Sequence, residues 1–91
     1  ESALAAQYAG TDGILIGTMD LLFREDDGWV LVDYKTDYAR SGAELLNEYS
    51  LQLILYQKAA ELLLNAPVKQ AFVYSFTLDE AFEVNLNDIA Y

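Results

Sequence analysis

The sequence predicts an α/β fold with a mixed sheet, in the order β-β-β-α-β. Three observations carry this prediction: short apolar runs separated by glycine-containing turns, one long segment of helical periodicity, and a further apolar run after it. Hydrophobic residues make up 54% of the chain, which excludes a disordered protein. A chain of 91 residues can bury only about 64% of its surface, enough for one core. We therefore predict that residues 1–91 form a single domain.

The three leading strands are expected over residues 2–8, 14–23 and 29–35. The first is only weakly apolar. A polar turn that ends in Asp27-Gly28 separates the second from the third and is typical of a hairpin. The third strand is almost continuously apolar until Asp33, so we expect it to be covered on both faces and to lie at the centre of the sheet.

A polar loop over residues 36–42 precedes a helix predicted from residue 43 to about 65, with Pro67 just beyond it as a stop signal. The next strand, over residues 69–76, returns after this helix and is therefore expected to run parallel to its predecessor. The tail is expected to add a short strand around residues 82–84.

Charge and composition exclude several kinds of catalytic and structural site. The chain carries 15 Asp and Glu against 5 Lys and Arg, a formal net charge of −10, and it contains no cysteine and no histidine. Disulfides, thiolate zinc sites, a cysteine nucleophile and a histidine general base are therefore excluded. No apolar run is long enough to span a membrane. Such an acidic chain repels phosphate unless a bound cation intervenes.

Three charged side chains interrupt apolar strands and are expected to meet. Alternation places Asp33 and Lys35 on the same face of their strand, and the hairpin brings Asp20 beside Val32 or Asp33. Two carboxylates and one ammonium would then cluster. Mg²⁺ takes oxygen ligands from one or two carboxylates, and the backbone carbonyl of Tyr34 could add another.

A magnesium ion held in this way would polarise a phosphoryl group and lower the pKa of a bound water. Lys35 would orient or deprotonate that water, or stabilise the developing negative charge. This is a design for phosphodiester hydrolysis without histidine or cysteine. The competing interpretation of Asp33 and Lys35 is a solvated strand end, which an Asp-x-Lys pattern alone favours; Asp20, inside an apolar run, is harder to explain in that way.

The helix contains a polar residue among apolar ones. Spacing by 100° per residue places Gln52 near the centre of an apolar stripe, with Tyr56 one turn later and Gln57 on the far side. The stripe comprises Leu45, Tyr49, Tyr56, Ala59, Ala60 and Leu63. Two interpretations remain open: Gln52 is a core amide that caps a backbone group, or Gln52 and Tyr56 face the charged cluster. Thr36, in the loop, could bond a phosphate or the loop backbone.

Three ordered motifs join these residues: G-x-x-D ending at Asp20, D-Y-K-T over Asp33–Thr36, and Q-x-x-x-Y over Gln52–Tyr56. With these spacings, residues 17–76 resemble the nuclease domain of the AddA and RecB helicase–nuclease subunits, which belong to the PD-(D/E)XK superfamily.

The resemblance implies a restriction-endonuclease-like core in which Asp20 and Asp33 bind the metal and Lys35 is catalytic. It also implies that Gln52 and Tyr56 support the site and contact DNA. The expected cofactor is Mg²⁺, for which Mn²⁺ could substitute. The family's leading helix and an upstream histidine that commonly assists the metal are not found in this sequence.

The function implied is that of a DNA exonuclease or endonuclease domain that processes DNA ends in double-strand break repair and recombination. Its expected partners are DNA, the rest of a parent helicase polypeptide and a second subunit, in the bacterial cytoplasm near the nucleoid. The chain begins without Met, so we expect a fragment of a longer protein, weakly active or inactive by itself. The alternatives are a catalytically inactive nuclease-fold module that binds DNA or a partner, a metal-dependent phosphatase, and a nuclease of a different lineage.

Overall fold

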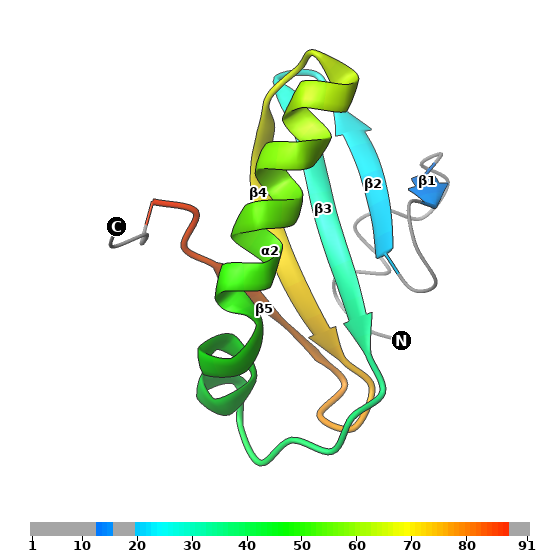
Figure 1. Cartoon of the computed structure of the whole chain (residues 1–91). Coiled ribbons are helices and arrows are strands. Elements are labelled where there is room, and N and C mark those ends of the chain that lie inside the picture. The colour runs from blue at the N-terminus through cyan, green and yellow to red at the C-terminus, as the bar shows by residue number, and fades with distance from the viewer. Residues whose placement is uncertain (1–12, 16–19, 88–91) are drawn as a thin grey trace.

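A computed structural model describes residues 13–15 and 20–87. These residues form a five-stranded mixed sheet, in the spatial order β1-β2-β3-β4-β5, with one helix (Figure 1). The elements are β1 (Gly13–Leu15), β2 (Asp20–Glu25), β3 (Gly28–Lys35), α2 (Gly42–Leu64), β4 (Val68–Ser75) and β5 (Glu80–Val84). The central strand β3 is antiparallel to β2 and parallel to β4. The predicted α/β class, the central position of β3 and the parallel return after the helix are confirmed.

One predicted strand is wrong. Residues 14–23 do not form a single strand, because β1 pairs antiparallel with β2, with Ile14 opposite Leu22. Two shorter strands therefore occupy that range. The strand predicted over residues 2–8 lies outside the described residues. The expected lack of a leading helix concerns the same part of the chain.

The turn between β2 and β3 is a tight hairpin, as predicted. Its two loop residues are Asp26 and Asp27, and Glu25 pairs with Gly28. Gly28 has a φ of +149°, which glycine adopts without the strain that a side chain would add. A Cβ at this position would also lie 3.1 Å from the carbonyl oxygen of Pro67. The hairpin thereby fixes the register of the two strands.

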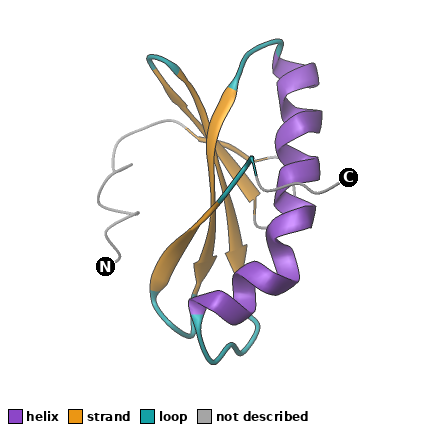
Figure 2. Ribbon diagram, turned by 90° about the vertical axis from the view of Figure 1, so that its left-hand side faces the viewer, coloured by secondary structure: helices purple, strands orange, loops and turns teal. Residues whose placement is uncertain are grey.

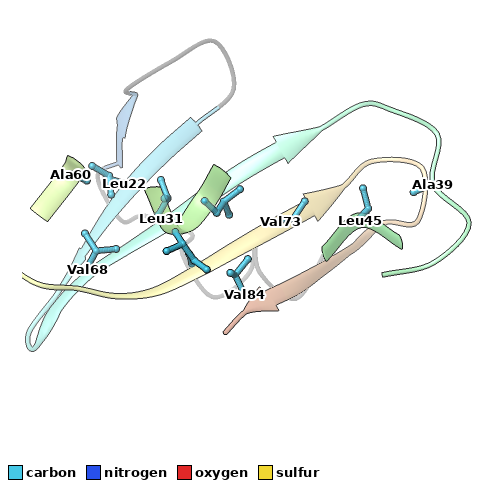
Figure 3. Close-up of a cluster of buried hydrophobic side chains, with 11 residues drawn as sticks. Leu22, Leu31, Ala39, Leu45, Ala60, Val68, Val73 and Val84 are labelled. Atoms are coloured by element: carbon cyan, nitrogen blue, oxygen red, sulfur yellow. The ribbon is translucent and has the colours of Figure 1, made fainter. Parts of the chain in front are cut away.

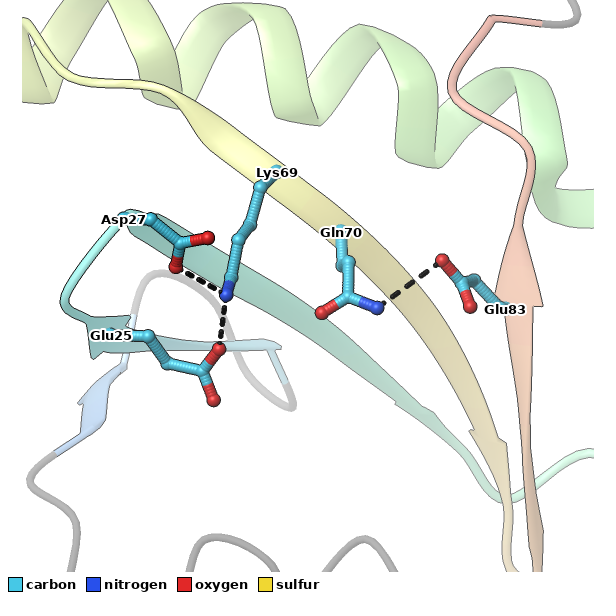
Figure 4. Close-up of polar contacts among 5 residues, drawn as sticks. All are labelled: Glu25, Asp27, Lys69, Gln70 and Glu83. Carbon is cyan, nitrogen blue, oxygen red and sulfur yellow. Dashed lines mark hydrogen bonds and ion pairs between the residues drawn. The ribbon is translucent and has the colours of Figure 1, made fainter.

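Polar side chains of β4 tie this hairpin to the rest of the sheet (Figure 4). The Nζ atom of Lys69 lies 2.6 Å from a carboxylate oxygen of Glu25 and 2.5 Å from one of Asp27. Farther along β4, Gln70 donates a hydrogen bond to Glu83 of β5 at 3.4 Å. The two carboxylates raise the pKa of Lys69, so this lysine stays charged.

The main core lies between α2 and one face of the sheet (Figures 2 and 3). Leu31 and Leu53, from the central strand and the helix, are fully buried in it. The full cluster comprises Leu22, Leu31, Ala39, Leu45, Leu53, Ile54, Ala60, Val68, Ala71, Val73 and Val84. A smaller buried cluster lies on the opposite face of the sheet and contains Phe23, Val30, Val32 and Tyr74.

The predicted phase of the helix is wrong. The buried side chains of α2 are Leu45, Leu53, Ile54, Gln57 and Ala60. The buried amide is thus Gln57, which donates a hydrogen bond to the carbonyl of Val68 at 3.5 Å, and not Gln52. Leucines surround the helix and several of them are exposed, Leu62 and Leu63 by 85% and 88%, so apolar spacing alone could not identify the packed face.

Helix α2 begins and ends with capping residues. Ser41 is the N-cap, and its side chain accepts a hydrogen bond from the backbone N–H of Glu44 at 3.2 Å. Asn65 ends the helix in the left-handed conformation, and the backbone N–H of Ala66 donates to the carbonyl of Glu61.

Loss of the N-cap should destabilise the domain measurably. We expect Ser41→Ala to lower the free energy of unfolding by about 1 kcal/mol, because a helix N–H group loses its partner. Urea denaturation followed by circular dichroism measures this. Ser50→Ala, inside the helix, is the matched control and should be neutral or slightly stabilising. An equal loss in both variants would contradict the capping role of Ser41.

Candidate active site

Asp20 and Asp33 lie directly opposite each other on β2 and β3. This is one of the two registers that the sequence predicted. Alternation along the strands places Asp20 on the same face as Leu22, and Asp33 on the same face as Leu31. Because both leucines belong to the main core, the two carboxylates lie on the side of the sheet that α2 covers. They occupy the edge of that core, where β2 begins and β3 nears its end.

The carboxylate of Asp33 is buried and poorly compensated. Its residue is 2% exposed, and Lys35 Nζ lies 3.2 Å from its Oδ2 atom. The approach lacks hydrogen-bond geometry, so Oδ2 has no hydrogen-bond partner within the described part of the chain. Burial and the neighbouring Asp20 carboxyl raise the pKa of Asp33 to about 7, against the opposing effect of Lys35. A bound cation would relieve the cost of this buried charge.

The aromatic ring of Tyr49, on α2, packs against the ammonium of Lys35. The Lys35 Nζ atom lies 4.2 Å from the centroid of the Tyr49 ring, a cation–π contact. The Tyr49 hydroxyl donates a hydrogen bond to Asp37 Oδ2 at 2.5 Å. Helical spacing placed Tyr49 only on the apolar stripe and did not connect it with Lys35. The one available signal was an aromatic residue one turn before Gln52.

The loop between β3 and α2 is anchored to the turn that follows β4. Thr77 donates a hydrogen bond from its hydroxyl to the carbonyl of Asp37 at 3.3 Å, and its hydroxyl also lies 3.1 Å from that of buried Ser75. The backbone N–H of Phe76 donates to the carbonyl of Lys35 at 3.0 Å. Ala39, 3% exposed, inserts from the loop into the core.

The remaining predicted residues lie on α2, at the start of the loop after β3 and on β3 itself. Gln52 donates a hydrogen bond to the hydroxyl oxygen of Tyr56 at 2.9 Å, and Tyr56 is 39% exposed. Thr36 is exposed at the start of the loop. The ring of Tyr34 points to the opposite face, where its centroid lies 5.8 Å from that of Phe76. The backbone carbonyl of Tyr34 remains a predicted ligand.

The donor set fits a hard divalent cation. Two carboxylates face each other, and one carries a buried oxygen without a hydrogen-bond partner in the described ranges. Oxygen ligands of this type suit Mg²⁺, which binds through one or two carboxylates and retains several waters. Within residues 13–15 and 20–87, no cluster of three or more acidic, histidine or cysteine side chains converges. Asp20 and Asp33 would therefore be the acidic ligands of such a site within the described residues.

Fold and site together are those expected of a nuclease domain, and comparison with known proteins agrees. The model of the PD-(D/E)XK nuclease superfamily matches residues 2–87, and the chain belongs to this superfamily. The mixed sheet with its helix is the α/β arrangement expected of that restriction-endonuclease-like fold.

The relatives are much longer proteins, each named as one of the subunits of an ATP-dependent helicase/nuclease. The relative from Clostridium perfringens (strain 13 / Type A) is 42% identical over 72 residues, which are 77% of this chain and 6% of that protein. The relative from Clostridium botulinum (strain Okra / Type B1) is 36% identical over 78 residues, 86% of this chain and 6% of that protein. The chain thus spans about 6% of the length of these curated relatives.

No helix in the described ranges has the length and hydropathy needed to cross a membrane.

Proposed function

We propose that this chain is the nuclease domain of a longer bacterial helicase–nuclease polypeptide and hydrolyses phosphodiester bonds of DNA with Mg²⁺. The observation that carries the proposal is the buried carboxylate of Asp33, whose Oδ2 lacks a hydrogen-bond partner among the described residues, between Asp20 and Lys35. A buried carboxylate pair of this kind is costly unless a cation joins it. The names of the relatives support a role beside a helicase.

In the proposed reaction, Asp20 and Asp33 would hold the cation. When bound, such an ion supplies positive charge that polarises the phosphoryl group and promotes deprotonation of the attacking water. The Lys35 ammonium orients that water or stabilises the negative charge that develops on the phosphoryl oxygens. Gln52 and Tyr56, hydrogen-bonded to each other on α2, support the site and contact DNA, and Thr36 offers a hydroxyl to a phosphate.

The resemblance to the AddA and RecB helicase–nuclease subunits also suggests a cellular setting. We place the domain in the bacterial cytoplasm at DNA ends that are processed for double-strand break repair and recombination, where its partner is the second protein of a helicase–nuclease complex. Mn²⁺ is expected to substitute for Mg²⁺. The rival function is a nuclease-fold module that binds DNA or a partner without cleavage; retention of Asp20, Asp33 and Lys35 favours the enzyme.

The decisive test replaces Lys35 in the longer polypeptide. With Mg²⁺, we expect Lys35→Met to slow cleavage of end-labelled DNA about 100-fold, because a positioned acid or base contributes about 10²–10⁴-fold. Lys58→Met, which removes an exposed lysine of α2, is the matched control and should cleave normally. Equal cleavage rates in the two variants would refute the catalytic assignment and favour the binding module. Linear and circular substrates, each single- and double-stranded, would separate exonuclease from endonuclease action.

A further inference from the structure

The ammonium of Lys35 is held from two sides. Asp33 Oδ2 lies 3.2 Å from its Nζ atom, and the Tyr49 ring centroid lies 4.2 Å away. Asp33 lies on β3, the same strand as Lys35, whereas Tyr49 lies on α2. The Lys35 ammonium therefore bridges the sheet and the helix. A lysine side chain has four flexible carbons and great rotamer freedom. An aromatic face restricts the ammonium without competing for its hydrogen bonds to substrate.

The Tyr49 ring is itself held in place. Its hydroxyl donates to Asp37 Oδ2 at 2.5 Å, and the carbonyl of Asp37 accepts a hydrogen bond from Thr77. The hydrogen bond to Asp37 raises the pKa of Tyr49 well above its ordinary range, so the hydroxyl stays protonated and keeps donating. The loop after β3 therefore holds the Tyr49 ring through Asp37, and the turn after β4 in turn anchors that loop through Thr77.

We propose that Tyr49 is a positioning residue for Lys35: its ring holds the ammonium beside Asp33, and Asp37 fixes the ring through its hydroxyl. The inference rests on the proposed function, because it assigns Tyr49 a role through the catalytic lysine. Tyr49 need not touch DNA or metal to act in this way.

Nuclear magnetic resonance tests the contact without any cleavage assay. The chain contains three lysines, Lys35, Lys58 and Lys69, so selective ¹³C labelling of the lysine ε-methylene groups gives three resolvable environments. Protons above an aromatic face shift upfield. We expect the Lys35 signal, identified by its loss in K35M, to lie upfield in the wild-type chain and in Y49F, and to move to the position of exposed Lys58 in Y49L.

Kinetics of the longer polypeptide test the consequence. We expect Y49L to lower kcat about 3- to 30-fold with KM for DNA nearly unchanged, which corresponds to the strength of a cation–π contact. Y49F keeps the ring and should restore most of the lost kcat. Tyr38→Leu removes a 79% exposed aromatic residue from the neighbouring loop and is the matched control, without effect on kcat or on the Lys35 signal.

The outcomes separate the two assignments. If Y49L leaves the Lys35 signal in place, or if Y49F loses as much kcat as Y49L, the positioning role is overturned even when K35M is inactive. If K35M cleaves normally, the proposed function is overturned, whatever the signals show. D37A and Y49F remove the same hydrogen bond, so the double variant should be no more impaired than either single one; additive losses would contradict the role of Asp37.

Discussion

Asp33→Ala, introduced into the longer helicase–nuclease polypeptide, is expected to abolish DNA cleavage while DNA unwinding continues at the wild-type rate. The variant removes the buried carboxylate whose Oδ2 atom is the strongest candidate metal ligand. Loss of Lewis-acid stabilisation worth several kcal/mol corresponds to a fall in kcat of about 10²–10⁴-fold. Unwinding should persist because a helicase motor would lie outside these 91 residues.

The loss would not arise from unfolding. Burial already disfavours the charged form of Asp33, and the Lys35 ammonium that loses its partner is partly exposed to solvent rather than fully buried. Asp26→Ala is the matched control, because it deletes an equal charge from the exposed hairpin turn. Cleavage and unwinding are measured on the same end-labelled duplex. A fully active Asp33→Ala protein would remove the basis of the metal assignment.

Asp33→Asn should make the domain more stable, and the gain should depend on pH. Burial and Asp20 raise the pKa of Asp33 from 3.8 to about 7 in the folded chain. Between these values the folded chain retains a proton that the unfolded chain has released, so the contribution of Asp33 to stability falls as pH rises from about 4 to 7. The shift of about 3 pKa units corresponds to at most about 4 kcal/mol. Asparagine carries no charge, so the Asp33→Asn variant does not lose stability by burying a charged carboxylate as pH rises.

Urea denaturation at two pH values measures the effect. We expect Asp33→Asn to exceed the wild type by about 2–4 kcal/mol at pH 8 and to match it near pH 4. Asp26→Asn, at the exposed turn, corrects for the change in net charge. An identical difference at both pH values would contradict the raised pKa.

Divalent metal should reduce the stability advantage of Asp33→Asn over the wild type. At pH 8, a cation bound only by the folded wild-type chain adds about 2.7 kcal/mol at a concentration 100 times its Kd. Asp33→Asn should gain much less, because it lacks the charged ligand. The same denaturation series with Mg²⁺ or Ca²⁺ therefore tests metal binding independently of cleavage.

Local signals predicted much of the fold. The Asp27-Gly28 turn and the apolar strand that ends in Asp33 and Lys35 predicted the hairpin. They limited the partner of Asp20 to Val32 or Asp33, and the structure has Asp33. The helix was expected from residue 43 to about 65, with Pro67 as a stop signal, and it spans Gly42–Leu64. These features depend on short-range chemistry that one sequence contains.

What the sequence did not predict depends on contacts between distant segments. Gly17 lies inside an apolar run that predicts one strand, although a glycine can equally mark a change of direction. The packed face of α2 could not be identified among leucines on all its sides. The Tyr49 contact with Lys35 requires the helix to dock on the sheet at one rotation, which spacing along the chain does not determine.

The pairing of Asp20 with Asp33 also makes the proposed site depend on the register between β2 and β3. Side chains alternate between the two faces of a strand, so a slip of one residue between β2 and β3 would turn Asp20 away from Asp33 to the far side of the sheet. A chain that pairs its strands incorrectly would separate its acids and be unable to cut. Under the proposed function, DNA cleavage would thereby be limited to molecules in which β2 and β3 pair in the correct register.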